Sequence, residues 1–179
     1  VKALEGFRDC GHLRDIPLVS SEELMVLDSY DGRRTAYDRR LTVPELFRLQ
    51  AKKTPEHTAV IFKEKRFSYR EIDRLSDGVA VYISRLGIGK EQVVSILIPR
   101  GEYMPIASLG AMKAGAVYQP LDPEYPPERL AFMMEDAQTE LLIADESLLG
   151  LVPRYKGKVL LTKEIPHLPA EGAEEIPAP

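Results

Sequence analysis

The sequence of 179 residues contains no tryptophan, a single cysteine and no long apolar run. The one cysteine, Cys10, excludes the intramolecular disulfides that stabilise small secreted domains, so we expect a reducing compartment, the cytoplasm. No apolar stretch approaches the roughly 20 residues that cross a bilayer, and residues 1–15 lack the apolar centre of a signal peptide. We therefore expect no contact with a membrane.

An excess of basic residues is also missing. The 24 Lys and Arg against 28 Asp and Glu give a net charge of -4, whereas non-specific binding of nucleic acid needs a basic surface. Nucleic acid is therefore not an expected partner. Hydrophobic residues make up 44% and charged residues 29% of the chain, which is typical of a folded protein, and the length fits about one domain.

Three predicted helices begin at a capping box, a Ser or Thr followed three residues later by Glu. The pairs are Ser20–Glu23, Thr42–Glu45 and Ser68–Glu71. Behind the third pair, apolar residues recur at steps of three and four from Ile72 to Leu86. Gly87 follows where a helix commonly ends in a left-handed glycine. The sequence therefore predicts a long amphipathic helix here.

The sequence predicts helices over 103–114 and 127–137. Short apolar runs between the predicted helices indicate strands. The predicted strands are 59–62, 93–98, 117–121, 141–144 and 159–161. The run Val93–Ile98 contains one polar residue, which is typical of a parallel strand buried on both faces, and we also expect Ala59–Phe62 to be buried. Alternation of strands and helices indicates an α/β fold with a mostly parallel sheet.

The two ends of the chain differ from this middle part. Residues 1–40 carry little periodicity and are predicted to be a linker, while 41–162 hold the alternating elements. Residues 163–179 are rich in Pro and Glu and predicted to be a connecting tail with too little apolar surface to fold alone. Since the chain starts with Val1 and ends in such a tail, we expect it to be part of a longer polypeptide.

Glycine-rich phosphate loops have no good match. A P-loop needs Lys followed by Ser or Thr, but Gly89-Lys90 is followed by Glu91 and Gly157-Lys158 by Val159. The run Gly87-Ile88-Gly89 lacks a third glycine and follows a predicted helix, which is the wrong position for a dinucleotide fingerprint. We interpret it as a helix end and turn.

Other catalytic or metal-binding patterns are equally weak. Cys10 lies in the predicted linker, and no serine stands in a Gly-x-Ser-x-Gly elbow. None of the histidines has a second ligand at metal-binding spacing; they are His12, His57 and His167. The close carboxylate pairs are interpreted as a turn and a solvated helix face; they are Asp122/Glu124 and Glu135/Asp136. We therefore predict no catalytic, cofactor-binding or metal-binding residue.

Three stretches together resemble one family. Ala111–Ala137, AMKAGAVYQPLDPEYPPERLAFMMEDA, is similar to the Lys-Ala-Gly…Tyr…Pro-x-Asp-Pro-x-Tyr-Pro-x-Glu-Arg signature of the adenylation domains of nonribosomal peptide synthetases. Arg66–Ser76 resembles their earlier Thr/Ser-Tyr-x-Glu-Leu motif, and Leu41–Phe62 the helix and strand that open them. Ile16–Leu24 resembles the linker after a condensation domain. The resemblance covers nearly the whole chain.

The resemblance implies the fold and activity of that family. The parent would be an ATP-dependent ligase that forms aminoacyl-AMP, with Mg²⁺, and loads the thiol of phosphopantetheine on a carrier protein. Upstream would lie a condensation domain. The matched motifs are structural: Gly115 would end a helix, Tyr118 fill a crevice near a strand end, and Asp122 fix the following turn. Gln119 departs from the family, where an apolar residue is usual, and Val117 beside Ala116 departs from a Gly-Ala order.

The family's phosphate loop, ribose-binding aspartate and catalytic lysine have no match in the sequence. The resemblance therefore implies an incomplete N-terminal part of an adenylation domain that does not catalyse alone. Two alternatives stay open: part of an acyl-CoA or aryl-acid ligase, and a non-catalytic interaction module. Because a sheet cut midway leaves open edges, we also expect the chain to self-associate.

Overall fold

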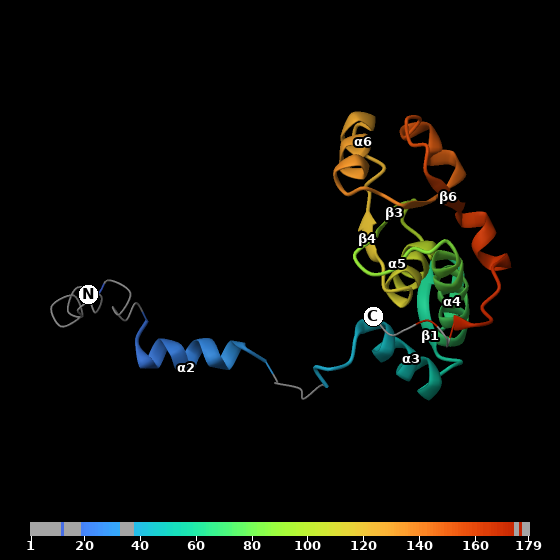
Figure 1. The fold of residues 1–179 in the computed structure, drawn as a ribbon. Coiled ribbons are helices and arrows are strands. Elements are labelled where there is room, and N and C mark those ends of the chain that lie inside the picture. The colour runs from blue at the N-terminus through green and yellow to red at the C-terminus, as the bar shows by residue number, and fades with distance from the viewer. Residues whose placement is uncertain (1–11, 13–18, 33–37, 174–175, 177–179) are drawn as a thin grey trace. The chain divides into compact units, whose positions relative to one another are not determined.

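The computed structural model describes residues 12, 19–32, 38–173 and 176 (Figure 1). The chain divides into two compact units, Val1–Arg39 and Arg40–Pro179. Cys10 and residues 16–18 of the predicted linker lie outside the described residues. None of the helices in the described part of the chain could span a bilayer.

The described part of the first unit contains one helix, α2 (Ser21–Tyr30). It begins at the predicted capping box: the Glu23 amide donates to Oγ of Ser20 at 3.2 Å, and the Ser20 amide donates to the Glu23 carboxylate at 2.7 Å. This start is therefore confirmed. The role of residues 1–40 as a linker stays a prediction.

A four-stranded parallel sheet forms the centre of the second unit, in the order β4-β3-β5-β6. The strands are β3 (Val93–Leu97), β4 (Val117–Pro120), β5 (Leu141–Ala144) and β6 (Lys158–Leu161). All four residues of β5 and four of the five of β3 are buried, as the nearly continuous apolar runs predict. The predicted α/β class with a mostly parallel sheet is confirmed.

Helices cover both faces of this sheet. The chain runs from β3 to β4 and then returns past β3 to β5, so right-handed crossovers place the two connecting helices on opposite faces. One apolar cluster joins the sheet to α4 (Tyr69–Arg85) and α5 (Tyr103–Lys113). The other joins it to α6 (Pro127–Asp136) and the 3₁₀ helix η2 (Glu146–Leu151) (Figure 1).

The two remaining strands form a separate antiparallel hairpin, β1 (Thr58–Phe62) and β2 (Lys65–Ser68). The expected strand over residues 59–62 is confirmed as β1, but its expected burial is wrong, because Ile61 is 59% exposed. Two residues connect the strands, with Lys63 at φ +53°, and so short a connection permits only an antiparallel pair. Helix α3 (Val43–Lys53) precedes the hairpin and starts at the predicted Thr42 cap.

The segment after β6 also packs against the second unit. It forms the 3₁₀ helix η3 (Thr162–His167), in which Ile165 is 1% exposed. Ala173 is likewise buried, and Leu168 packs against the first apolar cluster. Residues 163–173 thus pack on the core of the second unit through a few apolar residues. The expectation that this stretch has too little apolar surface to fold alone stays a prediction. Its role as a connection to a further domain also stays a prediction.

A buried ion cluster links α4 to α5. The side chain of Lys113 is fully buried, and its Nζ donates to Oδ1 of Asp73 at 2.6 Å, to Oδ1 of Asp77 at 2.8 Å and to the Asp73 carbonyl at 3.1 Å. Three donors thus meet three acceptors, which satisfies the ammonium without water. Arg48 of α3 lies 3.3 Å from Asp77 and extends the cluster to a third helix.

The backbones of α4 and α5 approach each other closely near this ion cluster. A Cβ added at Gly110 of α5 would lie 2.5 Å from the Cβ of Val79 of α4, closer than two such atoms can pack. The two helices therefore meet where one of them has no side chain. Lys113 lies one turn further along α5, so the ion cluster fixes the helices at the same contact.

Replacing Lys113 with methionine should lower the free energy of unfolding by about 3 kcal/mol, because two carboxylates then lose their buried partner. Denaturant titration measures this change. Lys163→Met is the matched control, since Lys163 pairs with Glu146 where both side chains are more than half exposed. Its effect should stay within about 0.5 kcal/mol. Equal effects of the two substitutions would contradict a structural role for the buried cluster.

Asp145 ties the end of β5 to η2 and η3. Its carboxylate accepts hydrogen bonds from the amide of Ser147 at 3.0 Å, from the Ser147 hydroxyl, and from Oγ1 of Thr162 at 3.2 Å. The bond from the Ser147 hydroxyl, followed by that from its amide, holds the pKa of Asp145 below its ordinary value, against the opposing effect of burial. The ionised carboxylate therefore stabilises the folded chain.

The destabilisation caused by Asp145→Ala should depend on pH. Because folding lowers the pKa, the stabilisation is complete above the unfolded carboxyl pKa of about 3.9 and is lost as the pH falls through the lower folded value. Melting temperatures of the variant and the wild type across this range measure the difference. Asp136→Ala removes an exposed carboxylate at the unfavourable end of α6 and should not destabilise at any pH. A constant Asp145→Ala effect down to strong acid would contradict the assignment.

Candidate functional site

The longest family-like stretch, Ala111–Ala137, runs from the end of α5 through β4 into α6. Gly115 follows α5 at φ +75°, which confirms its predicted role at the helix end. Asp122 accepts a hydrogen bond at Oδ1 from the amide of Glu124 at 3.0 Å, and at its carbonyl from the amide of Tyr125 at 3.0 Å. Its predicted role in the turn is therefore confirmed.

Two other residues of this stretch behave differently. Tyr118 does not fill a crevice as expected: it is 40% exposed, because β4 is an edge strand with no described partner on its outer side. Gln119, which stands where the family usually has an apolar residue, makes two hydrogen bonds through its side chain. Its Oε1 accepts from the hydroxyl of Ser95 at 2.8 Å, and its Nε2 donates to the carbonyl of Met133 at 3.3 Å. It joins β3 to α6 through a polar contact.

Of the described residues considered for chemistry, His12 lies in the first unit and the others are spread over the second. Gly87 ends α4, while Gly157 and Lys158 lie at the start of β6. The histidines are exposed; they are His12, His57 and His167. Among the described residues, no three His, Cys, Asp or Glu side chains come together as a metal would require. The structure thus brings none of these candidates together.

The carboxyl edge of a parallel sheet, where neighbouring connections leave on opposite faces, is the usual ligand position of such folds. Here that position lies between β3 and β5. After the end of β3, Glu102, 5% exposed, pairs with Lys65 of the hairpin at 2.6 Å. The ring of Phe62 would lie 3.6 Å from a Cβ at Gly101. The hairpin therefore covers the end of β3.

Opposing effects act on the pKa of Glu102 in its pair with Lys65. Burial alone would raise the pKa of Glu102, but the hydrogen bond and charge of Lys65 hold it below its ordinary value. The same hydrogen bond raises the pKa of Lys65. Both groups are thus ionised near neutral pH, and they act as a clamp between β2 and the start of α5.

A hollow of about 420 Å³ lies at the carboxyl ends of β5 and β6. Its lining residues are Asp145, Glu146, Ser147, Thr162 and Lys163. Lys163 pairs with Glu146 at 2.6 Å, and Asp145 is held by Ser147 and Thr162. Since these polar groups already bind one another, this hollow offers a ligand few unpaired partners.

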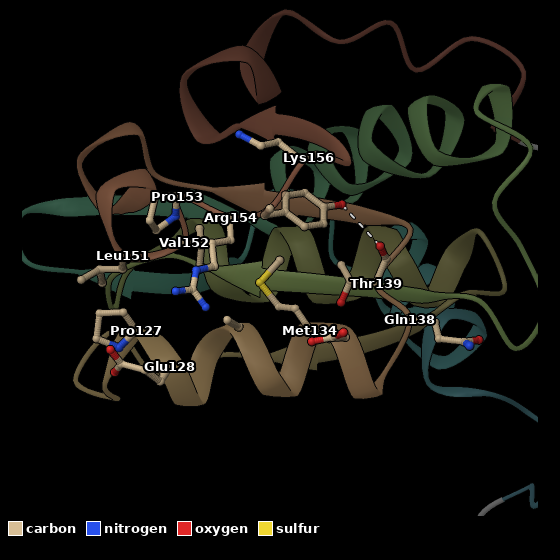
Figure 2. Close-up of a pocket in the computed structure, with 13 residues that line it drawn as sticks. Pro127, Glu128, Met134, Gln138, Thr139, Leu151, Val152, Pro153, Arg154 and Lys156 are labelled. Carbon is tan, nitrogen blue, oxygen red and sulfur yellow. Dashed lines mark hydrogen bonds between the residues drawn. The ribbon is translucent and has the colours of Figure 1, made fainter.

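A larger hollow of about 560 Å³ lies between α6 and residues 151–156 (Figure 2). Met134 and Val152, both almost fully buried, form its apolar side. Tyr155 is held in its wall because its hydroxyl donates to the carbonyl of Lys158 at 3.2 Å, with the Thr139 carbonyl at 3.5 Å. Burial, and then the charge of Glu140, raises the pKa of this tyrosine, so its hydroxyl keeps its proton. No sequence motif predicts this hollow.

Neither hollow fits ATP with Mg²⁺. A nucleotide site of this kind needs a glycine-rich loop whose amides surround the phosphates and a carboxylate that holds the metal. In the described ranges, the lining of the two hollows contains no such loop. We therefore derive no catalytic step from these residues.

Comparison with known proteins shows which family the chain belongs to. The family model for AMP-binding enzymes matches residues 47–176. Tyrocidine synthase 2 of Brevibacillus parabrevis is 38% identical over 75% of this chain, and tyrocidine synthase 3 is 39% identical over 85%. The chain spans only 4% and 2% of these two relatives.

Solved structures agree in fold. The N-terminal subdomain of NpsA from Klebsiella oxytoca, in complex with 3-hydroxyanthranilyl-AMSN, is 27% identical with a TM-score of 0.64, and covers 74% of this chain and 34% of its own. The nonribosomal peptide synthetase FmoA3 (S1046A) has a TM-score of 0.73 at 21% identity, over 85% of this chain and 16% of its own. The resemblance carried by Ala111–Ala137 is thus confirmed, and the chain belongs to the family of AMP-binding enzymes.

Proposed function

We propose that this chain is the N-terminal part of an adenylation domain in a nonribosomal peptide synthetase. The observation that carries the proposal is its similarity, at 33–41% identity, to tyrocidine, bacitracin and gramicidin S synthases over 74–85% of the chain. In the parent, the carboxylate of an amino acid attacks the α-phosphorus of ATP, the bond to the β-phosphate breaks, and aminoacyl-AMP and pyrophosphate form.

The described residues contribute structure to that reaction. The sheet, the α4–α5 pair and the turn at Asp122 form a scaffold behind the site, whereas binding of ATP and Mg²⁺ belongs to other parts of the parent. We expect the 179 residues to be inactive by themselves, since neither hollow fits the nucleotide.

The proposal also includes partners and location. The acyl group passes to the phosphopantetheine thiol of a carrier protein, and a condensation domain lies upstream. A related fold, the NpsA-ThdA artificially fused Adenylation-PCP di-domain, supports the carrier protein, with a TM-score of 0.62 at 24% identity. The cytoplasm is the proposed location.

Self-association of the chain through the open edge of β4 stays a prediction. Light scattering, which measures the mass of the particles in solution, tests it, and a monomer at high concentration would contradict it.

A second candidate is an aryl-acid ligase. It is favoured by the NpsA subdomain, whose structure holds 3-hydroxyanthranilyl-AMSN and is 27% identical to this chain. The two candidates share the adenylation step and differ in the acid activated. Only the acid that the parent accepts as substrate therefore distinguishes the two candidates.

Pyrophosphate exchange by the full-length parent tests the proposal. We expect exchange of labelled pyrophosphate into ATP to require one of the proteinogenic or modified amino acids, and not benzoate or anthranilate derivatives. Exchange only with aryl acids would establish the second candidate. Amino-acid-dependent exchange by the 179 residues alone would contradict the scaffold role.

A further inference from the structure

Phe132 is an aromatic side chain on the outer surface of α6. It is 66% exposed, more than any other large apolar side chain that the structure describes in the second unit. Single exposed apolar residues are common, so this exposure gains meaning only from what lies beside it. On the helix surface Phe132 neighbours Glu128, four residues before it, and Glu135, three residues after it. Both glutamates line the hollow beside α6, so Phe132 lies at its rim.

This hollow has the size and the lining to receive an aromatic ring. Its volume is about 560 Å³, and cavities of this size hold molecules larger than a benzyl group. Met134 and Val152 form an apolar floor, and the sulfur of a methionine makes favourable contacts with aromatic rings. One wall is fixed, because the hydroxyl of Tyr155 donates to the carbonyl of Lys158. The hollow is therefore formed before anything enters it.

Exposed charges of both signs surround the hollow. Helix α6 contributes Glu128 and Glu135, and the loop opposite contributes Arg154 and Lys156. Arg154 extends from this loop toward α6, as Figure 2 shows. In the part of the chain that the structure describes, none of these four side chains takes part in an ion pair. They are thus available to pair with charges of another molecule.

Two further charged residues of α6 lie close to Phe132. Asp136, one turn after it, is exposed and adds to the acidic side of this surface. Arg129 lies 4.4 Å from the centroid of the Tyr125 ring. The surface as a whole therefore has an acidic side on α6 and a basic side on the loop, so it is complementary to a second copy of itself turned by half a rotation.

From this arrangement we propose that the hollow beside α6 is the contact surface for a second copy of this chain, related by a two-fold axis. Phe132 of each copy enters the hollow of the other, and the acidic side of each α6 lies against Arg154 and Lys156 of the other copy. A two-fold interface requires both halves of a contact on one surface, because every contact occurs twice. An aromatic ring seated in a pocket contributes most of the affinity, while exposed charges mainly set the orientation. The proposal concerns association alone, so it does not depend on adenylation by the parent.

Sedimentation velocity of the 179-residue chain, from micromolar to millimolar concentration, tests this inference. We expect a monomer that becomes a dimer as the concentration rises. Phe132→Ser should weaken the dimer at least about tenfold, since it removes the apolar group that enters the hollow. Tyr118→Lys is the matched control: it places a charge on the open edge of β4, where it opposes strand pairing, and should leave the dimer unchanged. Circular dichroism spectra check that each variant folds.

Reversal of the charges tests the orientation of the two copies. Glu128→Lys/Glu135→Lys leaves the loop basic and makes its α6 side basic as well, whereas Arg154→Glu/Lys156→Glu makes both sides acidic. Each double variant should be monomeric by itself, because like charges then face each other, and an equimolar mixture of the two should form a heterodimer. A loss of stability would affect each variant alone and could not be restored by mixing.

Three results would overturn the proposal. They are a wild-type monomer at millimolar concentration, a dimer that Tyr118→Lys abolishes and Phe132→Ser does not, and a mixture of the two charge-reversed variants that stays monomeric.

Discussion

The contact between α4 and α5, sealed by the buried ammonium of Lys113, is the constraint on which the rest of the second unit depends. An isolated buried charge is costly, so Lys113 is tolerated only where Asp73 and Asp77 both reach it. Those carboxylates lie one turn apart on α4, and they fix how far along α5 the two helices meet. Because β4 follows directly after α5, this register also sets the position of the edge strand.

The way in which the sheet is covered supports the proposed role of the chain as a scaffold. Both faces of β3 and β5 are covered, and the hairpin covers the carboxyl end of β3 through Lys65 and Glu102. Residues of the family-like stretch serve turns and packing: Asp122 holds a turn, and Gln119, which departs from the family, joins β3 to α6. Membership of the AMP-binding enzymes thus rests on residues that shape the fold.

Local signals in the sequence predict local structure here. The capping boxes and the glycines at positive φ depend on neighbours within a few residues, so they could be predicted. The buried state of Lys113 could not, since its partners lie 36 and 40 residues away. Similarly, Gln138 adopts φ +51° after α6, where glycine would be expected, and no short-range pattern marks it. The hollow beside α6 joins segments that only the fold brings together.

Hydrogen exchange of the 179-residue chain tests most directly whether residues 40–173 form this scaffold by their own contacts. The account predicts that amides of β3, β5, α4 and α5 exchange slowest and with one common opening free energy, because these elements share a single core. Exchange of these amides at the rate of an unfolded chain would show that the scaffold needs other parts of the parent, and would contradict the account.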